Sequence, residues 1–104
     1  MDDQIRLQIA DSLEHLANEP KWDSELWQKC YQLVVANRSE DELVQHVVDD
    51  LIHYNGQFHS RNILGFTVKP HHGIVEEYRQ EFRDVATALR LRMSLKDAQE
   101  KYGF

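Results

Sequence analysis

The stretch that decides the fold comprises residues 39–54, which read SEDELVQHVVDDLIHY. Its opening, Ser39-Glu40-Asp41-Glu42, has the pattern of a capping box, in which Ser39 accepts a hydrogen bond from the backbone N–H of Glu42 and the Glu42 side chain reaches back. The apolar residues that follow recur at helical spacing: Leu43, Val44, Val47, Val48, Leu51 and Tyr54. Asn55-Gly56 comes next and favours the left-handed backbone that ends a helix. An amphipathic helix over 39–54 is therefore predicted.

Further helices are predicted on both sides of this stretch. Segments 2–18, 23–36 and 74–92 each carry an apolar stripe at helical spacing. A second capping pattern at Ser94 begins a short last helix, which Gly103 ends. Between the helices, residues at about 57–73 are expected to form an extended, partly buried loop, because the β-prone run 63–68 has no evident strand to pair with. The fold class predicted is all-α, a single domain over 1–104 built as a bundle of four to five helices.

Charge is distributed unevenly along the chain. The formal net charge is −6, and residues 1–60 carry −8 while residues 61–104 carry +2. An acidic total argues against direct nucleic-acid binding, which depends on cations that neutralise phosphates.

Cys30 is the only cysteine, is expected to pack in the core, and fits a reducing cytoplasm. The apolar runs are too short to span a membrane, and the first residues lack the features of a signal peptide.

The acids of the 39–54 helix are the leading candidate for a functional surface. Glu40, Asp41, Glu42, Asp49 and Asp50 lie on this helix and its entry turn, and no Lys or Arg occurs from residue 39 to residue 60. Such a one-sign patch attracts a basic protein partner and speeds their encounter. Aromatic residues beside the acids can anchor the contact. Those expected to do so are Tyr54 and Phe58.

An alternative use for these acids lies within the chain. Arg79, Arg83 and Arg90 fall in one line on the predicted 74–92 helix. Arginines beside an apolar stripe often lay their stems over neighbouring helices and pair with the acids found there. The acids of residues 40–50 are the expected partners, in which case the charge would serve stability and solubility.

The same helix offers a candidate metal site. His46, Asp49, Asp50 and His53 lie on or beside one polar face, and imidazole and carboxylate groups at such spacing can hold a divalent metal. A metal site normally takes ligands from more than one element, and the further candidates are His15, His59, His71 and His72. A solvated helix face is the competing interpretation, since no spacing matches a known zinc or di-iron signature. No cofactor is expected, and no motif indicates an enzyme.

Two stretches resemble the immunity proteins that neutralise DNase colicins. Ser39-Glu40-Asp41-Glu42-Leu43-Val44, followed by Val47, resembles the start of their acidic second helix, and Gly73-Ile74-Val75, followed by Arg79 and Arg83, resembles the opening of their last helix. That family carries two adjacent tyrosines and a proline between these helices, which are central to toxin binding. Here the interval contains Ile63-Leu64-Gly65-Phe66 instead, and an additional helix follows at the C-terminus.

The resemblance implies an acidic helical inhibitor of a basic nuclease toxin. Its toxin-facing residues would be Glu40, Asp41, Glu42, Asp49, Asp50 and Tyr54. The expected function is therefore that of a small cytoplasmic binding protein, most concretely an immunity protein or antitoxin. A metal-binding helical domain is the first alternative. A structural subunit of a larger assembly is the second, with Trp22, Trp27 or the 58–68 loop as its apolar contact.

Overall fold

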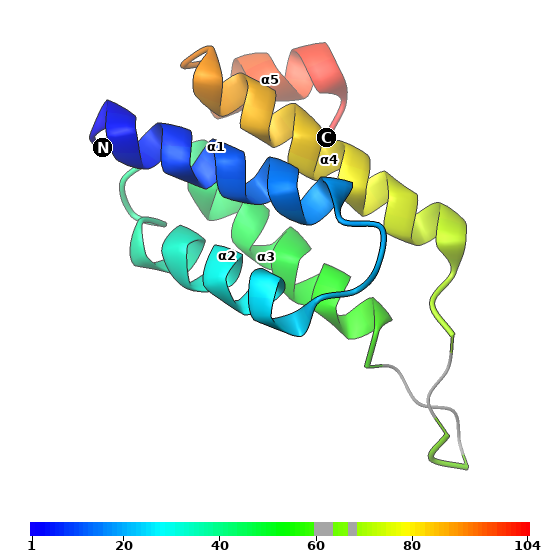
Figure 1. Ribbon diagram of the computed structural model, residues 1–104. Coiled ribbons are helices and arrows are strands. Elements are labelled where there is room, and N and C mark those ends of the chain that lie inside the picture. Colours follow the sequence, from blue (N-terminus) through cyan, green and yellow to red (C-terminus); the bar gives the residue numbers. More distant parts are fainter. Residues whose placement is uncertain (60–63, 67–68) are drawn as a thin grey trace.

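Five helices form the part of the chain that the computed structural model describes, namely residues 1–59, 64–66 and 69–104 (Figure 1). They are α1 Asp3–Asn18, α2 Ser24–Ala36, α3 Glu42–Gln57, α4 His72–Arg90 and α5 Leu95–Tyr102. The described residues contain no strand. The all-α helical bundle predicted from apolar spacing is thereby confirmed.

The four long helices pack in two pairs, and α5 lies across one end (Figure 1). α1 and α4 run antiparallel: Arg83 contacts Asn18 at the end of α1, and Arg90 contacts Asp11 and Glu14 in its middle. α2 and α3 form the second pair, and α3 also packs against α4. The short α5 contacts both α3 and α4. This arrangement places the start of α3 beside α1 and α5.

The core is formed by the apolar stripes of the helices. Its fully buried large side chains include Ile9 and Leu13 from α1, Val34 from α2, Leu43, Val47, Leu51 and Tyr54 from α3, and Phe82, Val85 and Leu89 from α4. Burial of a side chain of this size contributes about 1.5–3 kcal/mol to stability. The helical periodicity of the sequence therefore assigned the inward faces correctly except at the start of α4, where the expected core residue Ile74 is 41% exposed and Val75 is buried instead.

The start of α3 differs from the capping box predicted at Ser39. The N-cap is Asp41, whose backbone is extended and whose Oδ1 accepts a hydrogen bond from the Leu43 N–H at 2.8 Å. Residues 37–40 instead form a turn, with backbone hydrogen bonds from Asn37 to Val34 and from Glu40 to Asn37. The other oxygen of Asp41 binds Arg6 of α1 at 2.6 Å. A contact outside the segment thus holds Asp41, and not Ser39, at the cap.

The end of α3 also differs from the prediction. The helix continues through Asn55-Gly56 to Gln57, and Phe58 is its C-cap. The described glycines with positive φ are Gly65 and Gly103, so Gly56 keeps helical backbone. The Phe58 ring stacks on Trp22, with centroids 4.3 Å apart, and meets Tyr54 edge-on at 5.2 Å. These aromatic contacts stabilise the longer helix, because the extra turn places the Phe58 ring against Trp22 and Tyr54 at the end of the core.

α4 spans residues 72–90, two residues earlier at each end than predicted. His71 is its N-cap, with Nδ1 3.4 Å from the Ile74 N–H. At the other end Arg92 adopts left-handed backbone with φ 56°. The Met93 N–H donates to the Ala88 carbonyl, and the Arg92 N–H donates to the Leu89 carbonyl. This is a Schellman motif formed without glycine.

At α5, the predicted Ser94 cap and the Gly103 end are both confirmed.

Residues 64–66, between α3 and α4, lie away from the helices of the bundle (Figure 1). Residues 64–66 are described and turn at Gly65, which has φ 84°. Leu64 and Phe66 are 76% and 68% exposed. The part of the loop around Gly65 is therefore exposed, whereas Phe58 and Pro70 near its two ends are half-buried, as expected for a partly buried loop. Residues 63, 67 and 68 of the β-prone run lie outside the described residues.

Candidate functional site

The acids of α3 and its entry turn occupy three different environments. Glu40, Glu42 and Asp49 are exposed to solvent. Asp41 is 13% exposed and is bound to Arg6 as well as to the α3 backbone. Asp50 faces α4, where it is 20% exposed. The acidic run that is continuous in sequence therefore provides an accessible surface at only three of its five positions.

The α4 arginines do not pair with these acids. Arg90 binds Asp11 and Glu14 of α1 at 2.8 and 2.7 Å, and Arg83 donates to the side-chain oxygen of Asn18 and to the Ala17 carbonyl. The pairing within the chain that the sequence suggested is thus present, but with α1 and not with residues 40–50. The remaining arginine of the line, Arg79, donates to the Tyr54 hydroxyl at 3.1 Å and to Glu76 at 3.2 Å.

The two aromatic residues expected to anchor a partner are packed against the fold. Tyr54 is 1% exposed and meets Phe58, Tyr78 and Phe82 edge-on within the core. Phe58 is half-buried by its stack on Trp22. Trp27, a candidate subunit contact, stacks on Tyr31 and donates its indole N–H to the Leu51 carbonyl at 2.9 Å. Tyr54 therefore has a structural position, and Phe58 offers only part of its ring.

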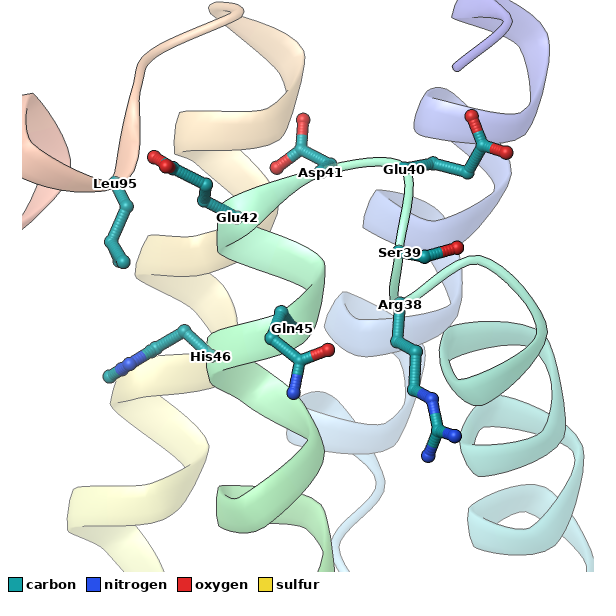
Figure 2. Close-up of a pocket in the computed structure, with 8 residues that line it drawn as sticks. All are labelled: Arg38, Ser39, Glu40, Asp41, Glu42, Gln45, His46 and Leu95. Carbon is teal, nitrogen blue, oxygen red and sulfur yellow. The ribbon is translucent and has the colours of Figure 1, made fainter.

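An open cleft of about 520 Å³ lies at the start of α3, between this helix, the turn before it and the start of α5. Its lining is Arg38, Ser39, Glu40, Asp41, Glu42, Gln45, His46 and Leu95 (Figure 2). Figure 2 shows that Glu42 and His46 extend from α3 on the side from which Leu95 of α5 approaches. Three carboxylates and one guanidinium give the cleft an acidic lining. It is suited to a basic side chain of a partner.

A second cluster lies between α3 and α4 and contains His46, Asp50 and Glu81. His46 Nε2 lies 3.5 Å from Asp50 Oδ2 and 4.0 Å from Glu81 Oε1, and one ligand atom from each residue falls within 4.8 Å of the other two. His46 Nε2 and Asp50 Oδ2 are buried and have no hydrogen-bond partner among the residues that the structure describes. The ring of Phe104 stacks on His46 with centroids 5.3 Å apart. The C-terminal segment thus packs on one ligand of a possible cation site.

The environment of this cluster disfavours negative charge. Burial, together with a hydrogen bond to Asp50 and repulsion from Asp50 and Asp84, raises the pKa of Glu81 to about 8. Burial, together with the negative charge of Asp50, Glu81 and Glu77, also raises the pKa of Tyr78. No Lys or Arg of the described ranges forms an ion pair with Asp50 or Glu81. Glu81 therefore holds a proton more readily than an ordinary glutamate does, in a position without a Lys or Arg partner among the described residues.

The sequence identified part of this cluster. His46 and Asp50 belong to the predicted metal set, but Asp49 and His53 are exposed and lie outside the cluster. The member of the cluster that the sequence analysis did not name is Glu81. The only signal for it was its position next to Phe82 in the core stripe of α4, which places it at the edge of a helix interface.

The other histidines considered as ligands lie elsewhere. His15 approaches Glu19 at 4.0 Å, and His59 meets the edge of Trp22. His71 caps α4, and His72 is its first residue. None of these histidines belongs to the His46, Asp50 and Glu81 cluster among the residues described.

Comparison with known proteins gives no relative. The chain matches no protein-family model, and no match was found among curated proteins or solved structures. The resemblance to DNase colicin immunity proteins thus stays a sequence-based expectation. Among the described residues, no helix combines the length and the apolar character needed to cross a membrane.

Proposed function

We propose that this chain is a small, acidic, non-catalytic binding protein of the cytoplasm. It docks the start and the exposed face of α3 on a basic protein partner, most concretely a nuclease toxin that it holds inactive. The observation that carries the proposal is the state of Glu42 and Asp49. Both are exposed, and neither forms an ion pair with a Lys or Arg in the described part of the chain. Of the α4 arginines, Arg83 and Arg90 are engaged by α1, and Arg79 by Tyr54 and Glu76.

The exposed face of α3 consists of Glu42, Gln45, Asp49, Ile52 and His53, which recur at helical spacing. Ile52 is 44% exposed and lies one turn from Asp49, so it provides the apolar contact that the buried Tyr54 does not. An apolar residue surrounded by charge is a common arrangement at the centre of an interface. This face therefore combines steering charge with one apolar anchor.

The mechanism is occlusion of phosphate-binding residues. A nuclease holds its substrate with Lys and Arg side chains, and the same side chains bind carboxylates. In the cleft at the start of α3, Glu42 accepts one such side chain, since Asp41 is bound to Arg6 and Glu40 lies 3.6 Å from the N-terminal ammonium. Asp49 lies two turns further along the same face as Glu42. Inhibition then follows because the partner cannot bind the inhibitor and a nucleic acid with the same cations.

The test is charge reversal on the exposed face. Glu42→Lys combined with Asp49→Lys should abolish capture of a basic partner by the tagged protein from its native cell, and should slow association with the purified partner more strongly at low salt. If that partner is a nuclease, the wild-type protein should inhibit DNA cleavage at equimolar concentration and the double variant should not. Asp50 is left unchanged, because it lies in the α3–α4 interface.

The matched control is Glu25→Lys combined with Glu100→Lys, which changes net charge equally at exposed acids of α2 and α5. This variant should retain the partner and most of the association rate. Equal loss in both double variants would show that only net charge matters. Retention of the partner by the Glu42 and Asp49 double variant would refute the proposal, and so would the absence of any saturable basic partner.

A second candidate function is suggested by the exposed apolar loop. Leu64 and Phe66 at its turn are the most exposed large apolar side chains of the described residues. Exposed apolar groups of this kind occur at subunit contacts. Self-assembly predicts a concentration-dependent mass in light scattering, and Leu64→Ser with Phe66→Ser should abolish it. A monomer at all concentrations would exclude assembly of this chain with itself.

A further inference from the structure

We propose that His46, Asp50 and Glu81 form a binding site for a divalent transition-metal cation such as Zn²⁺. The site does not require a basic partner, since it lies between α3 and α4, although His46 also lines the cleft at the start of α3. It uses one imidazole nitrogen and two carboxylate oxygens from two helices. Nitrogen together with carboxylate oxygen is a donor set that zinc and its neighbours in the first transition series accept.

The distances fit a cation after a small contraction. In a tetrahedral zinc site with bonds of roughly 2.0–2.2 Å, ligand atoms lie about 3.4 Å apart. His46 Nε2 and Asp50 Oδ2 are already 3.5 Å apart, and His46 Nε2 and Glu81 Oε1 are 4.0 Å apart. Glutamate has the longest side chain of the three, so rotation of Glu81 can close the remaining gap without movement of either helix.

Two buried atoms of the cluster point to a missing ligand. Within residues 1–59, 64–66 and 69–104, His46 Nε2 and Asp50 Oδ2 have no hydrogen-bond partner, although almost no solvent reaches them. Buried polar atoms are nearly always satisfied, and an ion is one of the few explanations for an exception. Both atoms are the ones that face each other across the candidate site. A single cation would satisfy both.

The surroundings support binding at this place. Phe104 stacks on the His46 ring and so limits its rotation. Glu81 lines two surface hollows, one with Asp50, Ile74, Glu77 and Tyr78 and one with Asp84, Tyr102 and Phe104, which provide routes for a hydrated ion. Three protein ligands leave at least one coordination position for water. The site thus has fixed ligands on one side and solvent access on the other.

The experiment titrates Zn²⁺, and separately Mn²⁺, into the full chain after treatment with EDTA and removal of the chelator. We expect stoichiometric, saturable Zn²⁺ binding by calorimetry and a Tm that rises with metal concentration. Co²⁺ should give visible absorption of a low-symmetry site with nitrogen and oxygen ligands. Absence of saturable binding at micromolar metal would overturn the proposal.

Isosteric variants separate this site from adventitious binding to histidine. Glu81→Gln and Asp50→Asn should each weaken Zn²⁺ binding by about 100-fold, and their circular dichroism should show that the fold is kept. The matched controls are Glu25→Gln at an exposed position of α2 and Asp49→Asn with His53→Gln on α3, which should bind as the wild type does. The assignment would be wrong if Glu81→Gln bound Zn²⁺ with wild-type affinity. It would also be wrong if, of all these variants, only Asp49→Asn with His53→Gln lost Zn²⁺ binding.

Discussion

Arg6 and Asp41 join the first turn of α1 to the first turn of α3. Arg6 Nη1 donates to Asp41 Oδ2 at 2.6 Å, and Arg6 Nε donates to the Leu89 carbonyl at 2.7 Å. Asp41 Oδ1 meanwhile caps α3 through the Leu43 N–H. Both side chains are largely buried, at 15% and 13% exposure. One carboxylate therefore fixes where α3 begins and which helix it begins beside.

Loss of Arg6 should destabilise the protein strongly. In Arg6→Ala the Asp41 carboxylate keeps its backbone bond but loses its cation in a poorly solvated position, and we expect unfolding to become easier by about 2–4 kcal/mol. Urea unfolding followed by circular dichroism measures the change. Arg38→Ala, which removes an exposed arginine at the edge of the cleft, should change stability by less than about 0.5 kcal/mol. Equal effects of the two substitutions would contradict the role of the pair.

The two serines with capping patterns should respond differently to substitution. Ser94 accepts a hydrogen bond from the Asp97 N–H at 3.1 Å, so Ser94→Ala should cost about 1 kcal/mol. Ser39 precedes the α3 cap by two residues, so Ser39→Ala should be nearly neutral. Thermal or urea unfolding of both variants provides the comparison. A larger loss at Ser39 than at Ser94 would restore the capping box that the sequence suggested.

Tyr54 should matter for stability and not for partner binding. Tyr54→Phe removes the hydroxyl that accepts from Arg79 Nε while the ring keeps its place among Phe58, Tyr78 and Phe82. We expect a loss of about 1 kcal/mol in the free energy of unfolding and unchanged affinity for a basic partner. A marked loss of affinity at unchanged stability would show that Tyr54 contacts the partner after all.

Cys30 should be unreactive in the folded protein. Burial raises the pKa of its thiol to about 11, and a hydrogen bond with Ser12 only partly opposes this shift. Since the thiolate is the reactive form, little of it is present at pH 8. A thiol reagent such as Ellman's reagent should react much faster in urea above the unfolding midpoint than in native buffer. Similar rates in the two solvents would show that Cys30 is accessible.

The free energy of unfolding of the metal-free protein should fall as the pH rises from about 4.5 to about 8. In this range Glu81 is protonated in the folded protein but ionised in the unfolded chain. Its pKa is about 8 in the fold and near 4.5 as an ordinary glutamate, so the folded state binds more protons between these values. The facing groups are Asp50 and His46 on α3, Asp84 on α4 and Tyr102 on α5. In Glu81→Gln the decline should be shallower, which Tm measurements from pH 5 to pH 8 in EDTA would show. Parallel profiles would contradict the shift.

The sequence alone determined the helices and their inward faces, because helical spacing of apolar residues is a local property. Ser94 and Gly103 mark α5 correctly for the same reason, since capping depends on neighbouring backbone groups. The local sequence pattern did not predict the N-cap of α3, because two residues near its start can both cap a helix. Ser39 and Asp41 are both good caps, and Arg6, distant in sequence, decides between them.

Tertiary structure alone decided which charges meet. The sequence shows that α4 has arginines and that α3 has acids, but the antiparallel packing of α4 on α1 gives Arg90 to Asp11 and Glu14. The packing of α3 on α4 brings Glu81 to His46 and Asp50, which are more than thirty residues away in the chain. Helix periodicity fixes the direction in which a side chain points relative to its own axis. Only the packing of the helices fixes what it points at.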